Sequence, residues 1–227
     1  MNGTSSLLNK RTLYSTITTF LLGAAWARSE SGSTNYLSSA VPTLVQAPKG
    51  IWEGDVGHGF ARGAESIGVS LGAGYGVKIF GTEAEHNLTL VSLSYGYMLG
   101  PIQAENHWYK GNWELRGEFF SGAQFSPSSE WLVGAAPHFR YNFITDTRWV
   151  PYLDIGAGVS ATSIGAPDLS RYFQFNVQAA GGVRYFICDN VAVGAEARYI
   201  HLSCASINNP NLGVNEVMGF AGVSWFF

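Results

Sequence analysis

Apolar and polar residues alternate along most of the chain after residue 64, which is the pattern of β-strands with two different faces. In the clearest segment, residues 171–187, Phe173, Phe175 and Val177 alternate with glutamine and asparagine. The same alternation predicts eight strands, over residues 65–80, 87–100, 112–125, 131–143, 149–161, 171–187, 190–203 and 215–227. An even number of alternating strands is typical of an antiparallel barrel or sandwich.

Two architectures fit this pattern: a soluble barrel or sandwich with its apolar face inward, or an outer-membrane barrel with its apolar face outward. The polar face mixes many glycines with opposed charges, namely Lys78, Glu114, Arg116, Glu118, Arg140, Asp154, Arg184, Glu196 and Arg198. This mixture suits the narrow interior of an eight-stranded barrel better than a soluble surface, which is usually richer in lysine and poorer in glycine. Trp113, Trp131 and Trp149 lie near strand ends, as in the aromatic girdles of membrane barrels. The sequence therefore predicts an all-β fold, an eight-stranded antiparallel transmembrane β-barrel of the bacterial outer membrane.

Composition and charge agree with this class of protein. Charged residues make up 13% of the 227 residues, the formal net charge is −3, and there are 28 glycines. This balance gives no electrostatic basis for nucleic-acid binding. The two cysteines, Cys188 and Cys204, flank the seventh predicted strand and would lie roughly 50 Å apart along it, too far for a disulfide.

The N-terminus carries an export signal. Lys10 and Arg11 precede a stretch of apolar and small residues that ends in Ala25-Trp26-Ala27, a sequence typical of a cleavage site. We therefore predict a signal peptide over residues 1–27, an N-terminal leader segment over residues 28–64 and the barrel over residues 65–227. The leader is rich in Ser, Thr, Asn and Pro and has little periodicity, so it is expected to be flexible or loosely attached.

The histidines outside the last two strands do not indicate a metal site. His58, His86 and His107 lie in predicted loops or the leader, without partners at metal-ligand spacing, so they are expected to be solvated. His138 falls on the interior face beside Arg140, which predicts a place in a packed polar interior. No metal or other cofactor is expected.

The residues best suited to chemistry gather at the end of the seventh predicted strand. His201 and Ser203 share the lipid-facing side with Tyr199, whereas Glu196 and Arg198 point into the interior. The Cα atoms of residues i and i+2 lie roughly 6.6 Å apart, close enough for an imidazole nitrogen to meet a serine hydroxyl. If both termini are periplasmic, this strand ends at the external surface. A polar pair that faces lipid is costly and so indicates a function, although water at the headgroup level is the simpler explanation of a lone His-x-Ser.

The chain continues this pair into a longer motif. It reads His201-Leu202-Ser203-Cys204-Ala205, then Asn209-Pro210-Asn211-Leu212-Gly213-Val214-Asn215-Glu216. This stretch resembles the motif of the PagL-type lipid A 3-O-deacylases, also described as outer-membrane acyloxyacyl hydrolases: His-x-Ser-Asn-Ala, a short loop, Pro-Asn-x-Gly and an acidic residue. The resemblance covers the barrel from residue 65 to residue 227.

The resemblance implies a serine esterase on the lipid-exposed wall of the barrel that removes an ester-linked acyl chain from lipid A. It assigns Ser203 as the nucleophile and His201 as the base. It assigns Asn211 to orienting the loop or stabilising the oxyanion, alongside backbone N–H groups near Ala205 and Ser206. The implied partners are lipid A or lipopolysaccharide as substrate and the lipids of the outer membrane, and a homodimer is left open.

Two positions depart from the family motif. Cys204 stands where the family has asparagine, and Asn215 stands at the acidic position, with Glu216 beside it. Strand parity sends Asn215 outward and Glu216 inward. Asn215 is a neutral acceptor that is able to orient a histidine, as in Cys-His-Asn proteases, whereas Glu216 would need a local bulge to reach the ring. With no working third member, the alternative is a non-catalytic outer-membrane barrel with a structural or adhesive role.

Overall fold

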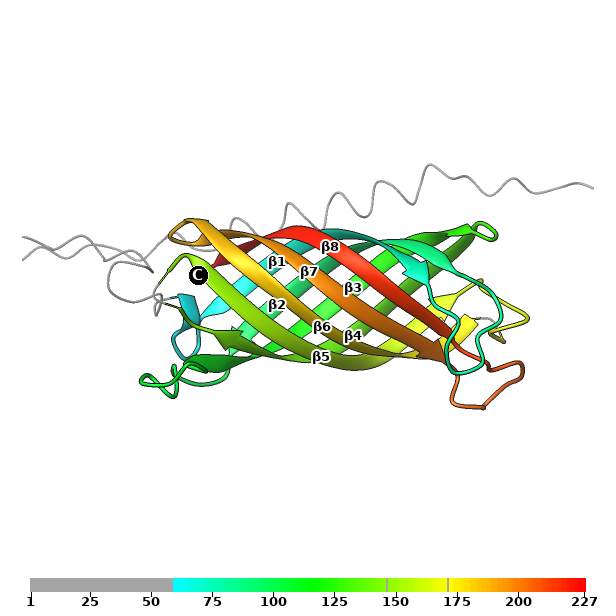
Figure 1. The fold of residues 1–227 in the computed structure, drawn as a ribbon, viewed down its shortest axis with the longest axis horizontal. Helices are drawn as coiled ribbons and strands as arrows, with labels where there is room; N and C mark the ends of the chain where they lie inside the picture. The colour runs from blue at the N-terminus through cyan, green and yellow to red at the C-terminus, as the bar shows by residue number, and fades with distance from the viewer. Residues whose placement is uncertain (1–58, 146, 171) are drawn as a thin grey trace, which may run out of the picture. The chain divides into compact units, whose positions relative to one another are not determined.

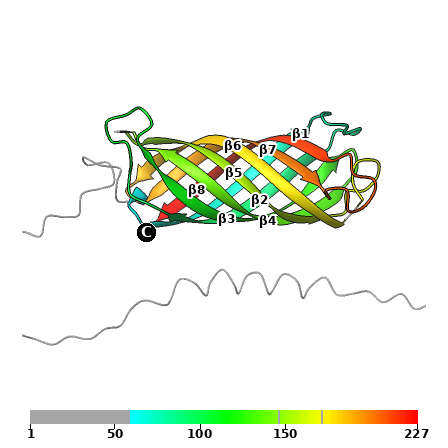
Figure 2. The same ribbon diagram turned by 90° about the horizontal axis from the view of Figure 1, so that it is seen from below.

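The computed structural model describes residues 59–145, 147–170 and 172–227, which form a closed antiparallel β-barrel (Figure 1). Its strands are β1 (Glu65–Gly76), β2 (Asn87–Met98), β3 (Gly111–Ser126), β4 (Glu130–Phe143), β5 (Trp149–Thr162), β6 (Tyr172–Cys188), β7 (Val191–Ser203) and β8 (Val214–Phe226). Each strand pairs with its neighbours in sequence, and β8 pairs with β1 to close the barrel. Figure 2 shows how strongly the strands are tilted against the long axis of the barrel. The predicted eight-stranded barrel is confirmed.

The two ends of the barrel carry different connections. One end, which we call the terminal end, holds the C-terminus and the β2–β3, β4–β5 and β6–β7 connections (Figure 1). The opposite end, which we call the site end, holds the β1–β2, β3–β4, β5–β6 and β7–β8 loops. The His-x-Ser motif at the end of β7 therefore lies at the site end.

The first strand is shorter than the alternating pattern predicted. It ends at Gly76 rather than at Phe80, and the loop that follows turns through Phe80 and Gly81, whose backbone angles are left-handed, with φ of 54° and 98°. Lys78 consequently lies in the exposed β1–β2 loop, where its Nζ is 3.6 Å from a carboxylate oxygen of Glu85. The prediction that Lys78 faces the interior was wrong.

The apolar face of the strands points outward. Leu71 and Ile155 are each 63% exposed, and many other large apolar side chains of the strands are also exposed. Charged side chains of the opposite face, such as Glu114 and Arg198, are buried inside the barrel. This is the reverse of a soluble barrel and fits a barrel surrounded by lipid. No helix in the described part of the chain has the length and apolar character needed to cross a membrane.

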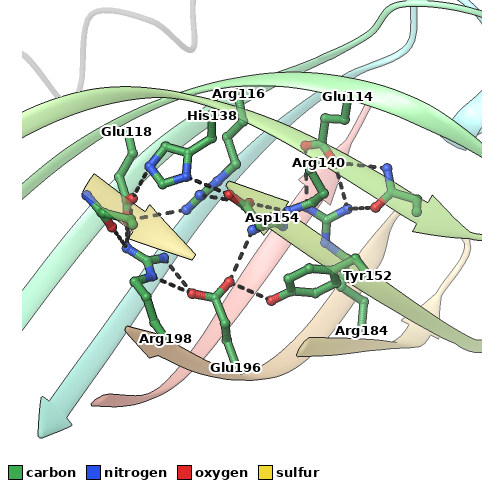
Figure 3. Close-up of polar contacts among 12 residues, drawn as sticks. Glu114, Arg116, Glu118, His138, Arg140, Tyr152, Asp154, Arg184, Glu196 and Arg198 are labelled. Atoms are coloured by element: carbon green, nitrogen blue, oxygen red, sulfur yellow. Dashed lines mark hydrogen bonds and ion pairs between the residues drawn. The ribbon is translucent and has the colours of Figure 1, made fainter. Parts of the chain in front are cut away.

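The middle of the barrel interior is filled by a network of ion pairs and hydrogen bonds (Figure 3). Its labelled members are Glu114, Arg116, Glu118, His138, Arg140, Tyr152, Asp154, Arg184, Glu196 and Arg198. His138 lies between Asp154 at 2.6 Å and Glu118 at 3.0 Å, and Arg140 Nε donates to Asp154 at 2.7 Å. Buried charges are tolerated only when they are paired in this way. The prediction that His138 belongs to a packed polar interior is confirmed.

Apolar clusters close the interior on both sides of this network, which the alternating pattern did not predict. The cluster at the site end consists of Leu88, Leu90, Phe120, Leu132, Ile164, Leu169, Ile200, Leu202, Val214, Met218 and Phe220. At the terminal end, Phe60 packs on Phe186 and Phe226, with ring centroids 5.8 Å and 5.3 Å away. Phe60 is fully buried, so the last residues of the predicted leader pack against the barrel. The predicted signal peptide and residues 28–58 lie outside the described residues.

Candidate active site

The end of β7 presents His201 and Ser203 on the outer wall. Both side chains are half-buried, whereas Leu202 between them is fully buried in the interior. In the sheet, His201 lies opposite Val177 of β6 and Asn215 of β8. The strand therefore places a base and a hydroxyl on the same outward face, as the parity of the sequence predicted.

Asn215, and not Glu216, meets the ring of His201. Directly opposed residues of an antiparallel pair have their side chains on the same face, so Asn215 points outward with His201 while Glu216, opposite Ile200, points inward. The Asn215 Oδ1 atom lies 2.8 Å from Nδ1 of His201. The carboxyl group of Glu216 is buried and has no hydrogen-bond partner among the described residues.

Tyr199 also contacts this amide, and sequence reasoning did not single it out. Its hydroxyl donates to Asn215 Oδ1 at 2.5 Å. The signal was available, because Tyr199 precedes His201 by two residues and shares its outward parity. Between His201 and Ser203 no hydrogen bond is formed in the described part of the chain. Catalytic hydrogen bonds are often long or poorly aligned in the absence of substrate.

Gly213 packs directly beneath the catalytic candidates. Its φ of +87° is in the left-handed region that favours glycine. A Cβ atom at this position would lie 2.8 Å from Cε1 of His201 and 3.3 Å from the carbonyl oxygen of Leu202. The glycine of the Pro-Asn-x-Gly segment is thus required both by the turn of the backbone and by the position of the imidazole ring.

Asn211 braces the β7–β8 loop. Its Oδ1 accepts the backbone N–H of Cys204 at 2.7 Å, and its Nδ2 lies 3.5 Å from the hydroxyl of Ser206. Next to Cys204 along the chain, Ala205 and Ser206 adopt left-handed backbone angles, with φ of 52° and 61°. Because the Asn211 oxygen holds the loop backbone, the geometry places Asn211 as a support of the loop.

Cys204 faces away from the outer wall. Its side chain is fully buried, its thiol donates to the carbonyl of Asn208 at 3.1 Å, and Ser170 donates to its sulfur at 3.5 Å. The position that is asparagine in the family motif therefore offers no side-chain donor beside Ser203. The backbone N–H of Ala205 makes no hydrogen bond within the described residues and lies next along the chain.

The β5–β6 loop ties the loops of the site end together through Asp168. Its fully buried carboxylate accepts the backbone N–H groups of Glu83 at 2.7 Å and Ala84 at 2.9 Å, and it lies 2.8 Å from Nε2 of His86. Burial alone would raise the pKa of Asp168, but these hydrogen bonds hold that pKa below its ordinary value of 3.8. The other ring nitrogen of His86 lies 2.6 Å from Gln124 Oε1.

His86 is thus a buried member of a hydrogen-bonded cluster, and its prediction as a solvated histidine was wrong. The loop that carries it folds back over the barrel end, which hydropathy does not reveal. His107 is exposed, as predicted, and stacks on Tyr109 with ring centroids 5.0 Å apart. His58 lies outside the described residues.

Thr82 is a further contact of the site that sequence reasoning missed. Its Oγ1 accepts from Asn215 Nδ2 at 2.6 Å. Thr82 and Asp168 come from loops that precede Asn215 by 133 and 47 residues, and such loops have no periodicity from which their contacts could be inferred. Neither residue had a recognisable signal in the sequence.

The closed barrel with an apolar outer wall and a buried ionic interior defines the class of outer-membrane β-barrels. It resembles the crystal structure of the outer membrane enzyme PagL with a TM-score of 0.53 and 19% identity, over 68% of this chain and 97% of that one. It resembles Neisserial surface protein A (NspA) equally, with a TM-score of 0.53 and 18% identity, over 72% of this chain and 99% of that one. These likenesses show the fold alone. The comparison with curated proteins found no match.

The family is shown by the sequence itself. The profile described as "Lipid A 3-O-deacylase (PagL)" matches residues 89–224, which is more than half of the chain. The chain therefore belongs to the lipid A 3-O-deacylase (PagL) family, an ester hydrolase family of the outer membrane. The resemblance in the β7–β8 motif and the class of fold are both confirmed.

Proposed function

We propose that this protein removes the ester-linked acyl chain from the 3-O position of lipid A, with Ser203 as nucleophile, His201 as general base and Asn215 as the residue that orients the base. The observation that carries the proposal is the 2.8 Å contact between His201 Nδ1 and Asn215 Oδ1, made on the same face as Ser203. It supplies the nucleophile, base and orienting group that serine esterases need, in a member of a deacylase family.

The reaction follows from these positions. Ser203 Oγ attacks the ester carbonyl carbon while His201 Nε2 takes the hydroxyl proton. The tetrahedral intermediate then breaks its bond to the sugar oxygen, which receives the proton from His201 and leaves as a hydroxyl group. Water, deprotonated by His201, attacks the acyl group on Ser203, and the free acid and the hydroxyl of Ser203 are released.

The negative charge of the intermediate requires a donor beside Ser203. The backbone N–H of Ala205 is suited to this role because it follows the nucleophile by two residues and has no partner within the described residues. The adjacent N–H of Ser206 is the other candidate, but it already donates to the sulfur of Cys204. Asn211 supports this segment by accepting the N–H of Cys204 at 2.7 Å, so the proposed oxyanion donor is a loop backbone rather than a side chain.

The substrate would approach from the surrounding lipid. Ser203 lies opposite Phe175 and His201 lies opposite Val177, two apolar side chains that are 37% and 53% exposed on the outer wall. An acyl chain therefore stays in an apolar environment while its ester reaches the serine. We further propose that export by a signal peptide over residues 1–27 places the terminal end in the periplasm and the site end at the external surface.

A shallow groove on the outer wall provides a place for the acyl chain. It has a volume of about 780 Å³, within the range of roughly 300–1,000 Å³ usual for ligand sites. Small residues of β7 and β8 line it, among them Ala195, Ala197, Gly219 and Ala221. On β7 it begins at Ala197, four residues and about 13 Å from His201 along the strand.

Labelling with a serine-directed fluorophosphonate tests the nucleophile. In the folded, detergent-solubilised chain we expect the label on Ser203, and its loss in Ser203→Ala and in His201→Ala. Ser121→Ala, which removes an exposed serine of the same outer wall on β3, should label like the wild type. Equal labelling of wild type and Ser203→Ala would contradict the assignment.

A further inference from the structure

Asn215 is held by two different sets of neighbours, one on each side of its amide. The Oδ1 side faces His201 and Tyr199. The Nδ2 side faces the β1–β2 loop, where it donates to the carbonyl oxygen of Ile79 at 3.1 Å and to Thr82 Oγ1 at 2.6 Å. The Asn215 side chain is fully buried between them.

The two loop partners fix which way the amide points. A backbone carbonyl only accepts hydrogen bonds, so the group of Asn215 that faces Ile79 must be the NH2. The hydroxyl of Thr82 has carbonyl oxygens of Ile79 at 3.0 Å and Gly213 at 2.9 Å to donate to, which leaves its lone pairs free to accept from Asn215. The amide oxygen is therefore directed at His201.

This orientation sets the tautomer of the base. Because Asn215 Oδ1 only accepts, His201 must carry its hydrogen on Nδ1 to make the 2.8 Å contact. Neutral imidazole then has its free lone pair on Nε2, the nitrogen that must take the proton of Ser203. A reversed amide would turn an N–H toward Nδ1 and favour the opposite tautomer, with no lone pair for the serine.

The β1–β2 loop, which orients the Asn215 amide, is itself held in place by Asp168. Asp168 accepts the N–H groups of Glu83 and Ala84, which directly follow Thr82. The backbone carbonyl of Asp168 accepts the N–H groups of Leu212 at 2.9 Å and Gly213 at 3.1 Å. One residue thus joins the segment that carries Thr82 to the segment that leads into Asn215.

We propose that Thr82 is a positioning residue of the active site, which holds the amide of Asn215 together with the carbonyl of Ile79, and that this carbonyl selects a neutral amide over a carboxylate at position 215. The inference rests on the proposed function, because it concerns how His201 is oriented. A carboxylate in place of Asn215 would set an acceptor oxygen against the Ile79 carbonyl, two like dipole ends at about hydrogen-bond distance. The asparagine at the acidic position of the family motif therefore suits the β1–β2 loop, because its NH2 group donates to the Ile79 carbonyl.

The test compares Thr82→Val with Thr82→Ser in the full chain, folded in detergent, with purified 3-O-acylated lipid A as substrate. Valine keeps the shape of threonine and removes the hydroxyl. Because the Ile79 carbonyl still holds the amide, only part of the His201 population should lose the correct tautomer, so kcat should fall roughly tenfold to a hundredfold, less than the ~10⁴-fold of a complete loss, with little change in KM. Serine keeps the hydroxyl and should retain kcat within about threefold. The matched control is Thr147→Val, in the β4–β5 connection at the other end of the barrel, which should behave like the wild type.

A spectroscopic measurement separates this proposal from the proposed function. Nitrogen-15 NMR of the histidines should show His201 protonated on Nδ1 in the wild type and in Thr82→Ser, and a mixture of tautomers in Thr82→Val. If the wild type does not cleave lipid A but the tautomer of His201 still changes between the wild type and Thr82→Val, the proposed function fails and the positioning role stands. An unchanged tautomer in Thr82→Val, or an equal loss of kcat in Thr82→Ser, would overturn the positioning role.

A separate variant tests the preference for an amide over a carboxylate at position 215. Asn215→Asp should have a kcat at least about tenfold below the wild type, although it restores the acid usual in serine triads. A kcat equal to or above that of the wild type would overturn the selection for a neutral amide.

Discussion

Gly213 lies against the imidazole ring of His201, so close that a Cβ atom would be 2.8 Å from Cε1. Gly213→Ala should therefore displace the ring as well as strain a backbone with φ of +87° by roughly 1–2 kcal/mol. We expect kcat on lipid A to fall about a hundredfold, because small displacements of catalytic groups are that costly. Gly117→Ala on β3, where a Cβ meets nothing within 4 Å, is the control. Wild-type kcat in Gly213→Ala would show that the ring position is not critical.

Glu216 should be dispensable for catalysis although it stands beside Asn215. Its carboxyl group is buried in the interior and lacks a hydrogen-bond partner in the described part of the chain. Replacing it by leucine removes a buried polar group that costs about 1–3 kcal/mol, so Glu216→Leu should resist thermal unfolding better than the wild type and keep its deacylase activity. Asn215→Leu should lose activity. The reverse result, activity lost in Glu216→Leu and kept in Asn215→Leu, would assign the orienting role to Glu216.

The groove on β7 and β8 should set the preferred length of the acyl chain. Ala197→Leu fills the groove at the end nearer His201. Longer acyl chains should therefore be cleaved about tenfold more slowly relative to shorter ones. Fluorophosphonate labelling of Ser203 should not change, because the small probe does not enter the groove. The measurement is competition between two lipid A species that differ in 3-O-acyl length. Ala123→Leu, on the outer face of β3, is the control, and an unchanged preference in Ala197→Leu would exclude the groove as the chain site.

The loop clamp at Asp168 should be sensitive to acid. In the folded protein, the pKa of the Asp168 carboxyl lies below its ordinary value of 3.8. The ionised form therefore stabilises the folded loops. This contribution is complete above the unfolded pKa of about 3.9 and is lost as the pH falls through the folded pKa. The amide NMR shifts of Glu83 and Ala84, which donate to the carboxylate, should titrate with a midpoint below 3.8. Asp168→Asn should abolish that transition. A midpoint at or above 3.8, or the same transition in Asp168→Asn, would show that another group is responsible.

The outward-facing part of the site was predictable because a strand has a period of two. Once His201 and Ser203 were placed on the lipid-facing side, parity sent Asn215 to the same face and Glu216 to the interior, and the register of β7 and β8 agrees. Tyr199 follows from the same rule. The ionic interior was predictable for the same reason, since charges recur on the face opposite the apolar one.

The parts that the sequence did not predict depend on loops and on packing between distant segments. Thr82, His86 and Asp168 lie outside the strands, where no periodicity relates a residue to its partner. β1 ends at Gly76, earlier than its alternating pattern suggested, and a left-handed turn follows at Phe80. Apolar residues such as Leu88 and Phe120 point inward near the strand ends, because the barrel closes its ionic middle with apolar side chains rather than with more charges.

Mass spectrometry of lipid A tests the central claim most directly. Cells that carry 3-O-acylated lipid A and express the wild-type chain should lose one ester-linked acyl group from lipid A. Cells that express Ser203→Ala at the same level in the outer membrane should keep that group, and cells that express Ser121→Ala should lose it like the wild type. Loss of the same acyl group with Ser203→Ala would contradict the account.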